Sequence, residues 1–266
     1  MNGKVLAMAV LTGMALPPAA AALRPGDVVS GFTVRSVTEL PEVKGRLVRM
    51  AYEKNGADLA WLDRDDDNMT FAIGFRTFPQ DDTGVAHIIE HSVLCGSEKY
   101  PVKEPFVDLL KSSFATFLNA WTSADSTMYP VCSRNGADFL NLVDVYMDSV
   151  LHPLSVKDPF AFEQEGWHYE LDTADGELRR NGVVYSEMKG AFANPERRLY
   201  HELRRLLRGH CSVSRQVVAC QRDSDSKTDK GLSINSHQIT PLSSNRFGIL
   251  GFKASGDQLS TIIRIR

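Results

Sequence analysis

The feature that most constrains this chain is a pair of histidines four residues apart, His87 and His91, with Glu90 beside the second. On an α-helix, residues four apart lie on one face, so two imidazoles can bind one metal ion. Glu90 lies on the same arc and can reach a water molecule held by that ion. Residues 85–94, which follow a break at 79–84, are expected to begin that helix.

The order His-x-x-Glu-His is that of the inverted zinc peptidases. Two imidazoles and one carboxylate suit zinc, with the fourth position left to water. Glu187 is one candidate for the carboxylate, and Glu163, Glu165 and Glu170 are its rivals. The alternative is a helix with two surface histidines and a glutamate, because short motifs also occur by chance.

Strand and helix patterns mix along the chain without a strict βαβ rhythm, which favours an α+β fold with a mostly antiparallel sheet packed by helices. Strands are expected in 31–48, 69–75 and 126–132, with a hairpin turn at Asn55-Gly56. Helical spacing covers 103–119, 136–151, 158–167 and 183–207, the last broken at Asn194-Pro195. We expect one core face on 139–150 and another on Phe106, Leu109, Leu110, Phe114 and Phe117.

The chain of 266 residues is expected to contain one domain, residues 24–208, between two segments of another kind. Residues 1–23 combine Lys4, an apolar stretch and a run of alanines, which is typical of a targeting segment, and we leave them out of the expected fold. Residues 209–266 are rich in serine, lack glutamate and carry a net positive charge, unlike the net negative remainder. We expect this tail to be poorly ordered.

Composition excludes several classes of protein. With 43% hydrophobic and 24% charged residues, the chain is neither disordered nor a multi-span membrane protein. A net charge of −3 gives no reason to expect nucleic acid as a partner, and the N-terminal apolar stretch is too short and broken for a stable membrane span. Four cysteines without CxxC pairs do not form a disulfide scaffold, and Cys95 is expected to be a packed thiol at the end of the motif helix.

Four blocks of the sequence resemble the presequence protease branch of the pitrilysin-type zinc metallopeptidases. They are GFRTFPQDDTGVAHIIEHSVLCGSEKYPVKEPFVDLL, FLNAWTSADSTMYPV, EGWHYEL and GVVYSEMKGAF, and they occur in the family's order between about Gly31 and Leu207. The resemblance implies that one Zn²⁺ binds to His87, His91 and Glu187, with Glu90 as the general base. It also implies that Asn119 and Ala120 lie on a sheet edge that binds substrate peptide as an added strand. The alternative for that segment is a plain strand.

The resemblance further implies a zinc-dependent endopeptidase that hydrolyses short unstructured peptides, such as cleaved targeting presequences, in the mitochondrial matrix or a plastid. The N-terminus, by contrast, resembles a secretory signal. Members of the family are much longer, and their second half contributes groups that stabilise the oxyanion, so we expect poor activity from the isolated chain and a complementary C-terminal half as a possible partner. The alternative is a non-catalytic zinc-binding or partner-binding fragment of the same fold.

Overall fold

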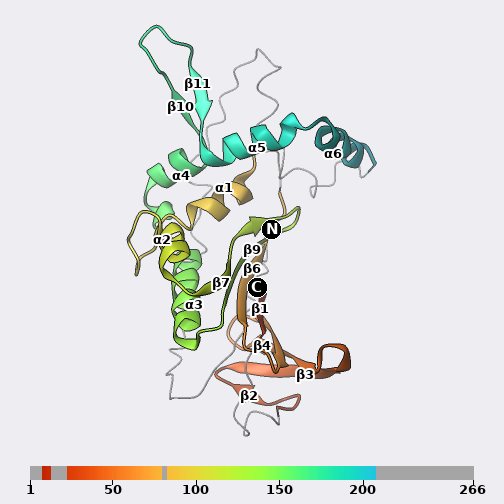
Figure 1. Ribbon diagram of the computed structural model, residues 1–266. Coiled ribbons are helices and arrows are strands. Elements are labelled where there is room, and N and C mark those ends of the chain that lie inside the picture. The colour runs from red at the N-terminus through yellow and green to blue at the C-terminus, as the bar shows by residue number, and fades with distance from the viewer. Residues whose placement is uncertain (1–7, 13–22, 80–82, 208–266) are drawn as a thin grey trace.

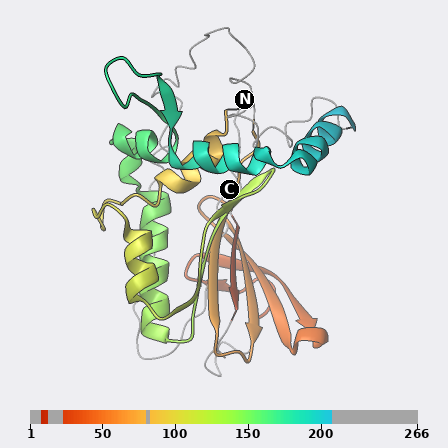
Figure 2. The ribbon, with the colours of Figure 1, turned by 45° about the horizontal axis from the view of Figure 1, so that its top comes forward.

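The computed structural model describes residues 8–12, 23–79 and 83–207, and of residues 8–12 and 204–207 it describes the backbone alone. Most strands form one large, mostly antiparallel sheet, and helices lie along one flank and at one end of it (Figures 1 and 2). The predicted α+β class is confirmed. In the described residues the chain runs through β1 (Met8–Thr12), β2 (Val28–Val29), β3 (Phe32–Leu40), β4 (Gly45–Tyr52), β5 (Asp58–Arg64), β6 (Met69–Arg76), α1 (Val85–Ser92), α2 (Pro105–Ser112), β7 (Ala115–Leu118), β8 (Trp121–Thr122), β9 (Ser126–Ser133), α3 (Gly136–Leu151), α4 (Pro159–Glu165), β10 (His168–Glu170), β11 (Arg179–Asn181), α5 (Val183–Ala193) and α6 (Pro195–Leu207).

The sheet order is β2-β3-β4-β5-β1-β6-β9-β7, and β8 also pairs with β9. Strand β6 supplies the centre of the core, because Met69, Phe71, Ile73 and Phe75 alternate along it and are all buried. Burying one such side chain stabilises the fold by roughly 1.5–3 kcal/mol. The sheet is therefore a firm base for the helices at its end.

Several elements predicted from the sequence are confirmed. The β4–β5 hairpin turns at Asn55-Gly56, where Gly56 has a φ of 70° and the Asn55 side chain accepts a hydrogen bond from the Ala57 backbone. Helix α3 spans 136–151 as predicted, and the predicted break lies at Asn194, between the end of α5 and the start of α6 at Pro195.

The single helix predicted for 103–119 is wrong. Helix α2 ends at Ser112, Ser113 is extended, and residues 115–118 form β7 against β9. Pairing with β9 overrides the local helical spacing of the apolar residues, because β9 provides hydrogen-bond partners for the backbone of residues 115–118. As a result the core face predicted for this segment is also wrong in part: Phe114 is 73% exposed, and Leu110 and Phe117 are exposed as well.

Residues 8–12 also differ from expectation. They form β1, which lies between β5 and β6, parallel to the first and antiparallel to the second. A short apolar run can form a strand as readily as the core of a targeting signal, which explains the difference. Targeting by residues 1–23 stays a prediction, and residues 209–266 lie outside the described residues.

Among the helices in the described ranges, none has the length and apolar composition needed to cross a bilayer.

Candidate metal centre

Helix α1 carries the histidine pair at the end of the sheet. It begins after Gly84, whose φ of 69° turns the chain into the helix, and it contacts α4, α5, β8 and β9 (Figure 2). Ile88 and Ser92 face the interior, and the Ser92 hydroxyl donates to the Ile88 carbonyl at 2.7 Å. This packing leaves the half-buried rings of His87 and His91 on a neighbouring face, with centroids 5.0 Å apart.

Glu187 reaches the histidine pair from α5. Its Oε2 lies 3.5 Å from Nε2 of His87 and 3.6 Å from Nε2 of His91. The three ligand atoms all lie within 4.8 Å of one another. In a tetrahedral zinc site with bonds of about 2.1 Å, two ligand atoms are about 3.4 Å apart. The observed spacing and the donor set of two imidazoles and a carboxylate therefore fit a zinc ion.

The protonation of the histidines bears on metal binding, since a metal needs a neutral imidazole nitrogen. Burial, and then the neighbouring His91, lower the pKa of His87 to about 4. Burial also acts to lower the pKa of His91, but the hydrogen bond with Glu165 and the charge of Glu187 outweigh it and raise that pKa. His87 is thus neutral at pH 7 and has a lone pair for a cation.

Glu90 is buried on the inner side of α1, with 5% of its surface exposed. Within the described residues its Oε2 has no hydrogen-bond partner, which is costly for a buried carboxylate oxygen. Burial raises the pKa of Glu90, against the opposing effect of the Thr122 hydroxyl on β8. A carboxylate with a raised pKa and a free oxygen can accept a proton from a water molecule beside the histidines.

The three rivals of Glu187 lie elsewhere. The carboxylate of Glu165 contacts His91 at Nδ1, at 3.1 Å, on the side of the ring away from Glu187. Glu163 is exposed, and Glu170 in β10 accepts a hydrogen bond from Asn181. Among these candidates the structure brings Glu187 to the Nε2 atoms of both histidines.

Glu165 has a role that the sequence reasoning missed, because a contact to the far side of His91 follows from no spacing rule. In the sequence Glu165 stands only among the rivals of Glu187, and the block EGWHYEL that contains it is the one signal that points to it. Cys95 lies in the same corner, at the end of α1, with Sγ 3.6 Å from Glu165 Oε1. Burial, and then the charge of Glu165, raise the pKa of the Cys95 thiol to about 12, which agrees with a packed, protonated thiol.

Asn119 and Ala120 lie between β7 and β8, on the far side of β9 from β6. The Asn119 backbone N–H donates to Pro130 of β9, whereas the Ala120 N–H is bound by the Asn119 side chain at 2.9 Å. Thr122, two residues on, interacts with Glu90. This edge of the sheet therefore runs up to the candidate metal centre.

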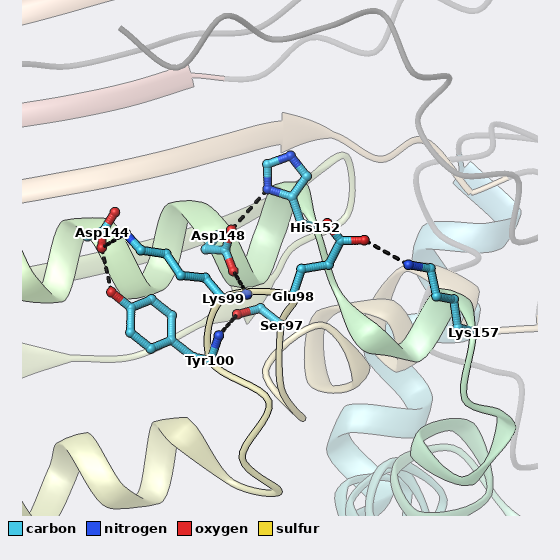
Figure 3. Close-up of polar contacts among 8 residues, drawn as sticks. All are labelled: Ser97, Glu98, Lys99, Tyr100, Asp144, Asp148, His152 and Lys157. Atoms are coloured by element: carbon cyan, nitrogen blue, oxygen red, sulfur yellow. Dashed lines mark hydrogen bonds and ion pairs between the residues drawn. The ribbon is translucent and has the colours of Figure 1, made fainter. Parts of the chain in front are cut away.

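The segment after α1 is fastened to α3 by polar contacts (Figure 3). The Asp148 carboxylate accepts a hydrogen bond from the Lys99 backbone at 2.8 Å and contacts His152 at 3.1 Å. The Lys99 ammonium and the Tyr100 hydroxyl both bind Asp144. These contacts hold the C-terminal side of α1 against the longest described helix.

Comparison with known proteins agrees with this geometry. The insulinase family (peptidase family M16) matches residues 68–194, which contain both histidines, Glu90 and Glu187. This part of the chain is similar to the peptidase M16 family. The predicted resemblance is thereby confirmed.

Two curated relatives extend the match beyond that region. Protein HypA of Clostridium perfringens is 52% identical over 177 residues, which are 66% of this chain and 18% of the relative. Presequence protease 1, chloroplastic/mitochondrial, of Arabidopsis thaliana is 50% identical over 166 residues, which are 62% of this chain and 15% of the relative. A crystal structure of pitrilysin is 21% identical in sequence, and the match covers 47% of this chain and 14% of the pitrilysin chain. Its TM-score of 0.39 is too low to define a shared fold. The chain thus spans less than a fifth of the length of these curated relatives.

Proposed function

We propose that this chain binds one Zn²⁺ through His87, His91 and Glu187 and belongs to a zinc peptidase that hydrolyses short unstructured peptides, such as cleaved targeting presequences. The observation that carries the proposal is the convergence of Glu187 Oε2 on both histidine Nε2 atoms, at 3.5 and 3.6 Å. The names of presequence protease relatives support presequences as substrates and a mitochondrion or plastid as the compartment. Because the chain is a small part of those relatives, activity of the isolated chain stays a separate question.

The protein's own groups suit this reaction. Zinc, when bound, lowers the pKa of a water molecule and polarises a carbonyl group. Glu90, with its unpartnered Oε2, accepts a proton from the attacking water and returns it to the leaving amine. The buried position of Glu90 keeps this carboxylate out of bulk solvent, where its pKa would be too low for an effective base.

The edge at Asn119 and Ala120 is proposed to bind the peptide as an added strand. Backbone hydrogen bonds give affinity with little dependence on side-chain sequence. The Ala120 N–H, now bound by the Asn119 side chain, is a donor that an incoming strand can take over. The exposed aromatic side chains of Phe117 and Trp121 lie on either side of this site along the chain.

The zinc proposal is tested by metal analysis of the purified chain. We expect one zinc ion per wild-type chain, and a loss of zinc in His91→Ala and in Glu187→Gln. Glu163→Gln is the matched control, because Glu163 is exposed and lies outside the cluster. Full zinc content in Glu187→Gln would overturn the ligand assignment.

The role of Glu90 is tested separately. Glu90→Gln is expected to keep zinc and to lower any peptide cleavage by about 10²–10⁴-fold, because the amide cannot accept the proton. Cleavage of a fluorogenic peptide is measured for the 266-residue chain with and without the substitution. A full-length relative provides the positive control, and the equivalent substitution is tested in it as well. Equal cleavage by the variant and its parent would exclude Glu90 as the base.

A further inference from the structure

The end of α4 contacts both helices of the metal centre through two consecutive residues. Glu165 Oε2 lies 3.1 Å from His91 Nδ1 on α1. The carbonyl oxygen of Gly166 accepts a hydrogen bond, at 3.3 Å, from the backbone N–H of Tyr185 on α5. Tyr185 lies in the first turn of α5, two residues before Glu187. The dipeptide Glu165-Gly166 therefore links α1, which carries the two histidines, to α5, which carries Glu187.

We propose that Glu165 and Gly166 are the positioning residues of the metal centre: Glu165 fixes the ring of His91, and Gly166 sets the distance of α5 from α1. The inference rests on the proposed zinc ligands and goes beyond them, since neither residue is one of those ligands.

The Glu165 carboxylate is held firmly enough for this role. It is 9% exposed, and its Oε1 receives hydrogen bonds from the Gln164 side chain at 2.8 Å and from the Cys95 thiol at 3.6 Å. Oε2 is thereby directed at His91. An anionic acceptor at Nδ1 keeps the proton on that nitrogen, so the Nε2 lone pair points toward Glu187.

Close backbone packing explains why glycine follows Glu165. A Cβ atom on Gly166 would lie 2.8 Å from the Phe162 carbonyl oxygen and 3.1 Å from Cγ2 of Ile88, the neighbour of His87 on α1. A Cβ atom on Gly182, just before α5, would lie 2.3 Å from the Gly166 oxygen, and the φ of Gly182 is 155°. A side chain on Gly166 would therefore press against α1, and one on Gly182 would press the start of α5 away from the end of α4.

The loss of Glu165 should loosen one ligand without removing it. With no partner at Nδ1, the His91 ring can rotate and adopt the other tautomer, so the Nε2 lone pair is no longer preset. Partners of this kind affect metal affinity by about 10–100-fold. Glu165→Gln keeps an acceptor oxygen but no charge, so it should restore part of that affinity.

Zinc affinity of the full chain provides the first measurement, by competition with a chromophoric chelator. We expect Glu165→Ala to bind zinc about 10–100-fold more weakly than wild type, Glu165→Gln to lie between, and the control Glu163→Gln to match wild type. Circular dichroism checks that the variants fold. Wild-type affinity in Glu165→Ala would overturn the proposal.

The tautomer of His91 in the metal-free chain provides the second measurement, by ¹⁵N NMR at pH 8. Wild type and Glu163→Gln should show the proton on Nδ1, and Glu165→Ala should show it largely on Nε2. This measurement needs no zinc, so it is independent of the proposed function. If the chain bound no zinc, the proposed function would be refuted, and the tautomer of His91 would still decide whether Glu165 orients the ring. An unchanged tautomer in Glu165→Ala would refute that role.

A glycine pair tests the spacing of α5. Gly182→Ala should weaken zinc binding while His91 keeps its tautomer, because the clash moves α5 and leaves Glu165 in place. The matched control is Gly190→Ala within α5, where an added Cβ would meet no atom of the described residues within 4 Å. Equal zinc affinity in the two variants would contradict the role of the close packing.

Discussion

At the scale of single residues, the metal centre depends on side chains whose neighbours set their charge. His87 stays neutral because burial opposes its protonation, and Glu90 gains basicity from the same cause. His91 is held by Glu165, and Asp144 on α3 is held by Lys99 and Tyr100 (Figure 3). The same side chains in bulk water would have neither these charges nor these orientations.

Asp144 gives a pH-dependent prediction at this scale. Partial burial acts to raise its pKa, but the hydrogen bonds from Lys99 and Tyr100 outweigh burial and hold the pKa below its usual range. A lowered carboxyl pKa stabilises the fold above the unfolded value of about 3.9, and this contribution is lost as the pH falls through the folded value. The side chain is 46% exposed, so solvent screening limits the effect to about 0.5–1 kcal/mol.

Asp144→Asn should therefore lower the free energy of unfolding at pH 7 by that amount, and the difference from wild type should shrink as the pH falls below the unfolded value and through the lower folded one. Urea unfolding across this range measures it. Glu39→Gln, at an exposed carboxylate on β3, is the control and should match wild type at every pH. A constant difference between Asp144→Asn and wild type would show that charge is not the cause.

At the scale of elements, helices with a regular apolar face were predictable and the sheet edge was not. Phe139, Leu142, Tyr146 and Val150 follow helical spacing along α3, and all four are buried against the sheet. In 103–119 the same helical spacing predicts one helix, but residues 115–118 form a strand because β9 provides hydrogen-bond partners for their backbone. Helical spacing is local information, whereas pairing with β9 depends on where the chain returns.

The start of α3 provides a prediction at the element scale. The Asn135 side chain caps the helix by accepting hydrogen bonds from the backbone N–H groups of Ala137 and Asp138, both at 3.1 Å. Asn135→Ala should lower the free energy of unfolding by about 1 kcal/mol, because two helix N–H groups lose their acceptor. Asn135→Asp keeps an acceptor and should stay close to wild type. A loss of equal size in both variants, measured by urea unfolding, would contradict the capping argument.

At the scale of the whole molecule, β1 joins the two parts of the sheet. Strands β5 and β6 are separated by residues 65–68 in sequence, yet each pairs with β1. Consecutive strands with so short a connection usually pair with each other. The sheet therefore depends on a segment far from both strands in sequence.

Val10 tests this dependence, since it pairs with Ala60 on β5 and with Ala72 on β6. Val10→Pro removes a backbone donor from a central strand and should cost about 1–3 kcal/mol of unfolding free energy. Hydrogen exchange should show faster exchange of β5 and β6 amides. Val10→Ile keeps the donor and is the control. Unchanged exchange in Val10→Pro would mean that β1 contributes nothing to the sheet.

The sequence by itself determined the features that repeat over a few residues. The i, i+4 histidine pair, the apolar stripe of α3, the β4–β5 hairpin and the break at Pro195 all follow from the geometry of one turn of backbone. Residue spacing left the carboxylate open, although the family resemblance implied Glu187, and the structure brings Glu187 to both Nε2 atoms. The tertiary structure alone placed Glu165 at the other side of His91 and β1 between β5 and β6. Those contacts join residues far apart in the chain, and their distances are set by how helices and strands pack, which no local spacing encodes.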